Sequence, residues 1–225
     1  MKENPSLVVM LTYNDVTVKN AYEIFEQCKR SKAQFWAMKE ESLPLEEMKA
    51  LFSYMKKCGK TTALEVVAYT EDKCLAGAEM AVECQCDFLM GTTFSGSVNE
   101  LCRKHGIRYM PFVGNVRGRP SVLYGSPREM IAEARRCLER GAYGVDLLGY
   151  RYTGNAAELI REVVSGLRAP VCVAGSVDSV QKLREIKAIA PWSFTIGGAF
   201  FAHKFGETFQ EQIDKVCAYM EGLPE

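Results

Sequence analysis

Apolar runs of four to seven residues alternate along the chain with longer stretches in which apolar residues recur at helical spacing. The first run covers residues 7–12, and Ala21, Ile24, Phe25 and Cys28 then follow at intervals of one or three positions. A short continuous apolar run is typical of a buried strand, whereas the second spacing is typical of a helix that packs one face on a core. The chain therefore begins with a strand followed by a helix.

The same pair of patterns occurs eight times. The expected strands cover residues 7–12, 33–38, 62–68, 87–92, 107–112, 144–148, 171–174 and 193–196. The expected helices begin near residues 15–17, 42–44, 70, 97, 126, 156, 179 and 208. Asp15 or Thr17 is expected to cap the first helix, and Ser126 with Glu129 forms a capping-box sequence that has Pro127 at the first helical position.

Strict alternation of strands and helices predicts a parallel sheet covered by helices, and eight repeats favour closure of that sheet. No GxGxxG motif follows the first strand, which argues against a dinucleotide-binding open sheet. The predicted fold class is therefore α/β, a single-domain (β/α)8 TIM barrel that covers residues 1–225. Residues 113–125 form the one long connection, which is either a mobile lid or an ordinary surface loop.

Composition narrows the class of partner. The chain has 28 basic and 28 acidic residues, so its net charge favours neither nucleic acid nor an acidic membrane surface. Nine cysteines without a CxxC pair indicate reduced thiols and a cytoplasmic protein. The apolar run near the N-terminus is too short for a signal segment or a membrane span. The sequence leaves open whether the chain forms a homo-oligomer.

Three charged residues occur in or at the end of predicted strands. Glu65 and Asp146 lie inside apolar runs, and Lys39 follows another. The outer face of a barrel strand packs on helices, so these side chains should point into the barrel, near the end where active sites form. Lys39 and Glu65 are on adjacent predicted strands and suit proton transfer beside a carbonyl group, with Asp146 as a third catalytic candidate. The alternative is a buried ion pair that only holds the strands in register.

Other polar residues are expected at the same rim. Asn14 and Thr92 follow the first and fourth strands, and Arg151, which follows the sixth, could orient an anionic group. The two histidines are not near acids at ligand spacing, so no metal ligand and no cofactor are predicted. A magnesium site made by Glu65 and Asp146 is a further alternative.

The last two predicted strands both end in glycine. Gly175 and Ser176 follow one strand, and Gly197 and Gly198 follow the other. Glycine lets the backbone approach an anion, and loops after strands seven and eight commonly bind phosphate in such barrels. These four residues are therefore predicted to bind the phosphate of a small phosphorylated substrate.

The segments Val173-Ala174-Gly175-Ser176 and Thr195-Ile196-Gly197-Gly198-Ala199 resemble the phosphate-binding end of the ribulose-phosphate-binding barrels, a superfamily that includes N-acylglucosamine-6-phosphate 2-epimerases. The chain is also similar to short barrels catalogued as 4-hydroxythreonine-4-phosphate dehydrogenases. The first resemblance implies a phosphosugar isomerase or epimerase, or an aldolase or decarboxylase, that works beside a carbonyl. The epimerases carry an acid at the end of strand seven, where this chain has Ala174-Gly175-Ser176. A non-catalytic barrel that binds a phosphometabolite is therefore the competing hypothesis.

Overall fold

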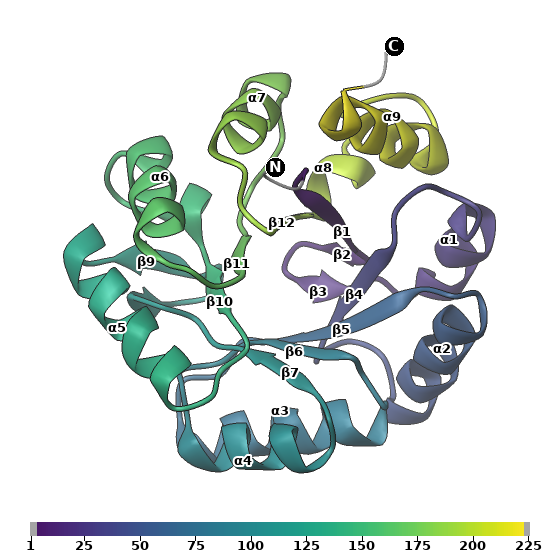
Figure 1. Ribbon diagram of the computed structural model, residues 1–225. Helices are drawn as coiled ribbons and strands as arrows, with labels where there is room; N and C mark the ends of the chain where they lie inside the picture. Colours follow the sequence, from purple (N-terminus) through teal and green to yellow (C-terminus); the bar gives the residue numbers. More distant parts are fainter. Residues whose placement is uncertain (1–3, 223–225) are drawn as a thin grey trace.

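The computed structural model describes residues 4–222, and within them eight parallel strands form a barrel surrounded by helices (Figure 1). The barrel strands are β1 (Ser6–Met10), β4 (Phe35–Lys39), β5 (Thr61–Val66), β6 (Phe88–Gly91), β7 (Arg108–Met110), β10 (Val145–Leu147), β11 (Val171–Val173) and β12 (Ser193–Ile196). The helices are α1 (Ala21–Cys28), α2 (Leu45–Lys57), α3 (Glu71–Glu83), α4 (Gly96–Lys104), α5 (Pro127–Glu139), the 3-10 helix η1 (Gly149–Arg151), α6 (Ala156–Gly166), α7 (Val180–Ile189), α8 (Gly198–Phe201) and α9 (Phe209–Glu221). All eight predicted strands are confirmed, and so is the predicted α/β barrel.

Hydrogen bonds close the sheet. Strand β1 pairs with β4 on one side and with β12, the last strand, on the other. Between β7 and β10 the closure rests on a parallel bridge from Phe112 to Asp146, in which the Asp146 amide donates to the Pro111 carbonyl at 2.8 Å. The first and last strands are therefore neighbours, and the barrel is complete around its circumference.

Alternating residues of each strand enter two different cores. On β1, Val9 packs outward against the helices while Val8 and Met10 pack inside the barrel. The same alternation places Trp36 outside and Ala37 inside on β4. Because side chains alternate along a strand, residues two positions from an inward residue also point inward. This alternation turns Lys39, Glu65 and Asp146 toward the barrel interior, as the sequence predicted.

Aromatic rings fill the end of the barrel at which the strands begin. The Trp192 ring contacts the rings of Phe35, Phe88 and Tyr143 at centroid distances of 5.5, 5.5 and 6.0 Å. The Arg108 guanidinium lies over the Phe88 and Tyr143 rings. This end is packed with side chains, so the functional groups inside the barrel are reached from the opposite end.

A β-hairpin follows β1, where the sequence led us to expect a helix. Strands β2 (Thr12–Tyr13) and β3 (Val16–Thr17) pair antiparallel, and α1 begins only at Ala21, after Asn20. The expected caps, Asp15 and Thr17, were therefore wrong. The Thr17 hydroxyl instead donates to the Lys39 carbonyl and accepts from the Lys39 amide, which ties the hairpin to the end of β4.

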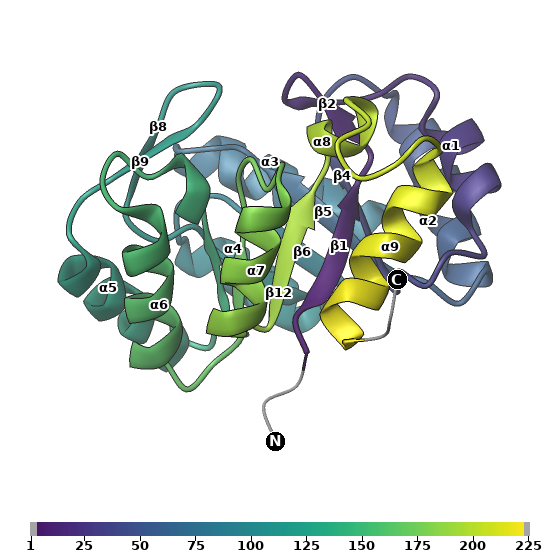
Figure 2. The same ribbon diagram turned by 90° about the horizontal axis from the view of Figure 1, so that it is seen from above.

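A second hairpin occupies the long connection at residues 113–125. It consists of β8 (Asn115–Arg117) and β9 (Val122–Tyr124), paired antiparallel. Figure 2 shows both hairpins and α8 at the same end of the barrel. The capping box of α5 is confirmed, because the Ser126 hydroxyl accepts from the Glu129 amide while Glu129 accepts from the Ser126 amide. No helix within residues 4–222 is long and apolar enough to cross a membrane.

Candidate active site

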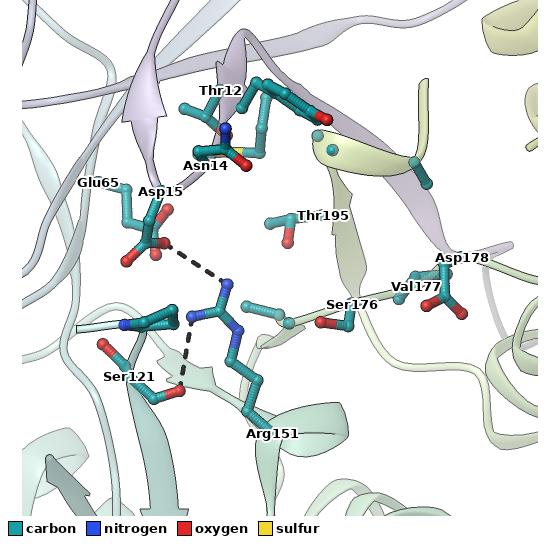
Figure 3. A pocket seen from close by; sticks show the side chains of 18 of the residues that line it. Thr12, Asn14, Asp15, Glu65, Ser121, Arg151, Ser176, Val177, Asp178 and Thr195 are labelled. Carbon is teal, nitrogen blue, oxygen red and sulfur yellow. Dashed lines mark hydrogen bonds and ion pairs between the residues drawn. The ribbon is translucent and has the colours of Figure 1, made fainter. Parts of the chain in front are cut away.

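A cavity of about 500 Å³ opens at the end of the barrel where the strands finish. It has the size of a typical small-molecule site. Eight of the ten site residues predicted from the sequence line it: Asn14, Lys39, Glu65, Arg151, Gly175, Ser176, Gly197 and Gly198. The hairpin after β1 lies beside the turn after β12, and the turn after β11 lies next to Arg151 (Figure 3). The fold therefore brings the predicted acid and base groups and the predicted phosphate turns into one cavity.

Lys39 lies between two carboxylates in this cavity. Its ammonium group is 2.5 Å from Asp15 Oδ1 and 3.8 Å from Glu65 Oε2. All three side chains are less than one-tenth exposed. Lys39 and Glu65 are also directly opposite each other in the pairing of β4 with β5. The predicted Lys39–Glu65 pair thus exists, and Asp15 is the closer of the two acids.

Sequence reasoning missed Asp15 because the Asn-Asp turn was interpreted as the start of a helix. Asn14 has φ 49° and Asp15 has φ 67°, so both occupy the left-handed region. Positive φ at both central residues is the geometry of a two-residue hairpin turn, and asparagine and aspartate tolerate it well. The flanking Thr12-Tyr13 and Val16-Thr17 pairs have the β-branched and aromatic character of short strands. An Asn-Asp turn between two such pairs is the sequence signal that could have predicted a hairpin with Asp15 in its turn.

The protonation states of Lys39 and Asp15 follow from their contacts. Burial alone would lower the pKa of Lys39, but the charge of Glu65 and the hydrogen bond with Asp15 raise that pKa overall. Burial alone would raise the pKa of Asp15, but Lys39, Arg151 and Arg119 outweigh it and lower that pKa. At neutral pH the site therefore holds an ammonium group beside an ionised Asp15. A protonated lysine is not a nucleophile, so the resting site is not prepared for Schiff-base formation.

Asp146 lies beneath the cavity and does not line it. Its side chain is completely buried, and neither carboxyl oxygen has a hydrogen-bond partner. Burial, followed by the negative charge of Glu65, raises the pKa of Asp146 well above its ordinary value, and Lys39 offsets this only in part. An unpaired carboxylate is too costly in such a place, so Asp146 is a neutral acid. Of the three predicted catalytic residues, Asp146 is the one that does not line the cavity.

We expect Asp146→Asn to make the free energy of unfolding less dependent on pH. The unfolded aspartate loses its proton near 3.8, whereas the folded one keeps it to a higher pH. The stability that Asp146 contributes is therefore fully present below the unfolded pKa and is lost as pH rises through the folded pKa. Asparagine has no such loss, and each pH unit between the two pKa values is worth about 1.4 kcal/mol.

Urea unfolding between about pH 5 and 9 measures this effect. The curve of stability against pH should be flatter for Asp146→Asn than for the wild type. Asp72→Asn, at an exposed position on α3, should leave the curve unchanged. Parallel curves for wild type and Asp146→Asn would show that Asp146 is ionised in the folded protein.

The two glycine turns follow β11 and β12 and line the cavity. Gly175 has φ +89°, and a Cβ there would lie 2.8 Å from Arg151 Cγ, so both conformation and space require glycine. Ser176 follows with φ 34°. Gly197 is packed against Thr12, whereas a Cβ on Gly198 would meet no atom closer than 3.9 Å. The predicted phosphate residues thus form two adjacent turns, and Gly198 borders open space.

Arg151 reaches from η1 into the middle of the cavity (Figure 3). One nitrogen is 3.5 Å from Asp15 Oδ1 and another is 3.5 Å from the Ser121 carbonyl. Both contacts are long for charge-assisted hydrogen bonds, which are usually about 2.7–2.9 Å. The guanidinium group therefore retains hydrogen-bonding capacity for an anionic ligand beside Gly175.

The structure does not bring Thr92 to the cavity. Its side chain is fully buried, and its hydroxyl lies 2.6 Å from the Tyr109 hydroxyl. The Lys39 ammonium lies beside Glu65, one of the two carboxylates of the alternative magnesium site. Within residues 4–222 no group of three or more His, Cys, Asp or Glu side chains is arranged to hold a metal ion.

No protein-family model and no curated protein sequence matches this chain. Many solved structures do resemble it. Orotidine 5'-phosphate decarboxylase from Pyrococcus horikoshii OT3 matches with a TM-score of 0.72 at 13% identity, over 96% of this chain and 100% of that one. The tryptophan synthase A-subunit from Pyrococcus furiosus matches with a TM-score of 0.68 at 13% identity, over 99% and 100%.

N-acetylmannosamine-6-phosphate 2-epimerase from Clostridium perfringens matches with a TM-score of 0.64 at 13% identity, over 86% of both chains. At these identities the similarity establishes the fold. The barrel fold that the resemblance implied is therefore confirmed.

Proposed function

We propose that this chain is an enzyme that binds a small phosphorylated metabolite and moves a proton on a carbon beside its carbonyl group. The observation that carries the proposal is the position of Lys39, held between Asp15 and Glu65 in the same cavity as the two glycine turns. Structural neighbours with this fold include an epimerase and a decarboxylase that act on phosphorylated compounds by name. Their similarity supports the general kind of enzyme, and the residues of this cavity support the reaction.

Each residue has a defined role in the proposed reaction. Glu65 removes a proton from the carbon, and the electron pair of that C–H bond moves into the carbonyl to give an enediolate. The Lys39 ammonium stabilises the negative charge that develops on oxygen, while Asp15 fixes the ammonium in place. Return of the proton to the neighbouring carbon, together with transfer of a hydroxyl proton from one oxygen to the other, gives an isomerase. An epimerase requires in addition a second proton donor on the opposite face of the enediolate.

Phosphate binding would anchor the substrate for this chemistry. The amides at Gly175-Ser176 and at Gly197-Gly198 can donate to phosphate oxygens, and Arg151 adds a positive charge. Lys204 also lines the cavity. Anchoring a distant group fixes the reacting carbon relative to its base, which is where much of the catalytic effect of an enzyme arises.

Two other reactions share the same enediolate or enolate. In a decarboxylase or an aldolase, breakage of a C–C bond supplies the electron pair, and Lys39 stabilises the same developing charge. An aldolase that forms a Schiff base is less compatible with this site, because the neighbours of Lys39 raise its pKa. We therefore place an isomerase or epimerase first and a lyase that stabilises an enolate directly second.

A non-catalytic barrel is the second candidate function. Strand β11 is followed by Ala174-Gly175-Ser176, without the acid that the resembling epimerases carry there. Such a protein would keep the phosphate turns and bind a phosphometabolite without turnover. Within this hypothesis Lys39 and its two acids only hold β4, β5 and the first hairpin together.

We expect at least one phosphorylated ketose or keto acid to raise the melting temperature, because a ligand that binds only the folded state stabilises it. A ligand at about 100 times its Kd contributes roughly 2.7 kcal/mol, and inorganic phosphate serves as the weak reference. Each stabilising compound is then incubated in D2O, and deuterium uptake beside its carbonyl is followed by NMR. Deuterium uptake, release of CO2 or C–C cleavage supports the enzyme. Stabilisation by a compound that undergoes none of these three reactions supports the binding protein.

A further inference from the structure

The tip of the β8–β9 hairpin crosses the mouth of the cavity. The hairpin follows β7, and the order of strands around the barrel puts β7 four positions from β1, the greatest separation available among eight strands. Pro120 and Ser121, at the tip, line the cavity, and Ser121 is only 2% exposed. The tip of this hairpin therefore forms part of the cavity wall, together with loops from the opposite side of the barrel.

Arg119 attaches this tip to the opposite side. It donates to Glu41 Oε1 at 2.6 Å, and it lies 3.5 Å from Glu40 Oε1 and 3.9 Å from Asp15 Oδ2. Glu40 and Glu41 follow β4, and Asp15 belongs to the hairpin after β1. One side chain thus connects the hairpin to two separate segments across the mouth, and one of its partners is the acid that holds Lys39.

The inner contacts of Arg119 are incomplete. Asp15 Oδ2 and Glu40 Oε2 are buried and have no hydrogen-bond partner. The guanidinium of Arg119 lies 3.9 Å from Asp15 Oδ2 and 3.5 Å from the other oxygen of Glu40, Oε1, which accepts from the Val67 amide. Its planar fork has five donors. A small inward movement of the tip would let Arg119 donate to both acids. Arg119 therefore has a short hydrogen bond to Glu41 at the surface and only longer contacts to the more buried Glu40 and Asp15. We call this side chain a latch.

Two further contacts join the tip to the cavity wall. The Tyr69 hydroxyl, from the loop after β5, donates to the Gly118 carbonyl at 3.2 Å and lies 2.9 Å from the Ser121 hydroxyl. Arg151 donates to the Ser121 carbonyl at 3.5 Å. A phosphate beside Gly175 would compete with the Ser121 carbonyl for Arg151. Ligand binding would therefore change a contact that holds the tip.

We propose that Arg119 is the latch of a lid formed by residues 118–121, which it holds to Asp15, Glu40 and Glu41 across the mouth of the cavity. The lid opens to admit the ligand, and Arg119 then draws the tip onto Asp15 and Glu40. The part of this inference that concerns ligand exchange rests on the proposed function. The latch itself does not, because its contacts exist without ligand.

Hydrogen exchange of backbone amides tests the latch in the protein alone. Arg119→Gln should speed the exchange of amides in residues 117–122 by about tenfold or more, because local opening of the hairpin then breaks fewer contacts. Arg117→Gln is the matched control. Arg117 lies on the same hairpin and bonds only to Asn115 of that hairpin in the contacts found within residues 4–222. Equal exchange in Arg119→Gln and wild type, or an equal increase in Arg117→Gln, would overturn the proposal.

A second measurement asks whether the latch controls access. Inorganic phosphate is the probe, and 31P NMR line shapes report its exchange between free and bound states. Arg119→Gln should raise the association and dissociation rates together by at least about fivefold while changing Kd less, because a lid that only gates access leaves the bound state similar. Unchanged rates beside faster amide exchange would overturn the gating role. Absence of phosphate binding in wild type would count against the proposed function, and amide exchange would still decide the latch.

Discussion

Replacing Lys39 with methionine is expected to lower deuterium uptake beside the carbonyl of the substrate by at least about 100-fold, the lower end of what a general acid or base contributes. Methionine keeps much of the length of lysine and removes the positive charge that stabilises the enediolate. Glu65→Gln removes the base and should have an effect of similar size. Because the two groups act as one unit, the double variant should be little worse than either single variant.

The control for Lys39 is Lys60→Met. Lys60 is also partly buried, but it donates to the Ser31 and Ala33 carbonyls, away from the cavity. It should leave uptake near the wild-type rate.

Lys39→Met leaves two buried acids without their partner, and breaking a buried pair costs about 3–5 kcal/mol. Lys39→Met combined with Asp15→Asn removes one of these charges and should restore much of the stability without restoring uptake. Recovery of normal uptake in the folded double variant would show that Lys39 only holds the structure together.

Gly198→Val should weaken binding of a phosphorylated ligand by at least about tenfold, which is roughly 1.4 kcal/mol. Residue 198 begins α8, and the direction of its absent side chain is open to the cavity, with Tyr13 the nearest group at 3.9 Å. Valine would put two methyl groups where a phosphate must approach the backbone. Gly198 does not have a positive φ, so the turn itself should tolerate valine.

Titration calorimetry with a ligand from the stability screen, and with its unphosphorylated analogue, measures this effect. The analogue should bind both proteins alike, and Gly198→Ala should lie between them. Gly197→Val is not an equivalent test, because a Cβ there would lie 2.7 Å from Thr12 Oγ1 and 2.9 Å from the Thr12 carbonyl. Equal affinity of Gly198→Val and wild type for the phosphorylated ligand would mean that the phosphate binds elsewhere.

The sequence predicted the barrel well because strand burial leaves a strong local signal. Each barrel strand is a short apolar run, and a charged residue within such a run can only be accommodated on its inner face. Lys39 and Glu65 could therefore be paired from their positions alone, and the pairing of β4 with β5 puts them side by side. The glycine turns were equally visible, since few residues other than glycine reach φ +89°.

Asp15 and the role of Arg119 could not be obtained in the same way. The first hairpin is only six residues long, and its polar turn has the composition of a helix cap as well as of a hairpin turn. The contacts of Arg119 join segments 78 and 104 residues apart in sequence, to Glu41 and Asp15 respectively. No local pattern encodes such a contact, because it depends on which loops meet once the barrel has closed. The complete burial of Asp146 depends on how far residue 146 lies below the cavity. The alternation of side chains along a strand predicts only that the Asp146 side chain points into the barrel.

The pairing of β1 with β12 also determines at which stage of synthesis and folding the cavity can form. Asp15 follows the first strand, and Gly197 and Gly198 follow the last, so the cavity spans the junction between the two ends of the barrel. During synthesis a nascent chain carries Asp15, Lys39 and Glu65 long before residues 193–201 emerge from the ribosome. Until β12 inserts beside β1, the cavity lacks the turn at Gly197 and Gly198. The proposed binding of a phosphorylated ligand is therefore expected to require the finished barrel, and a ligand that bridges this junction would hold the earliest and latest parts of the chain together.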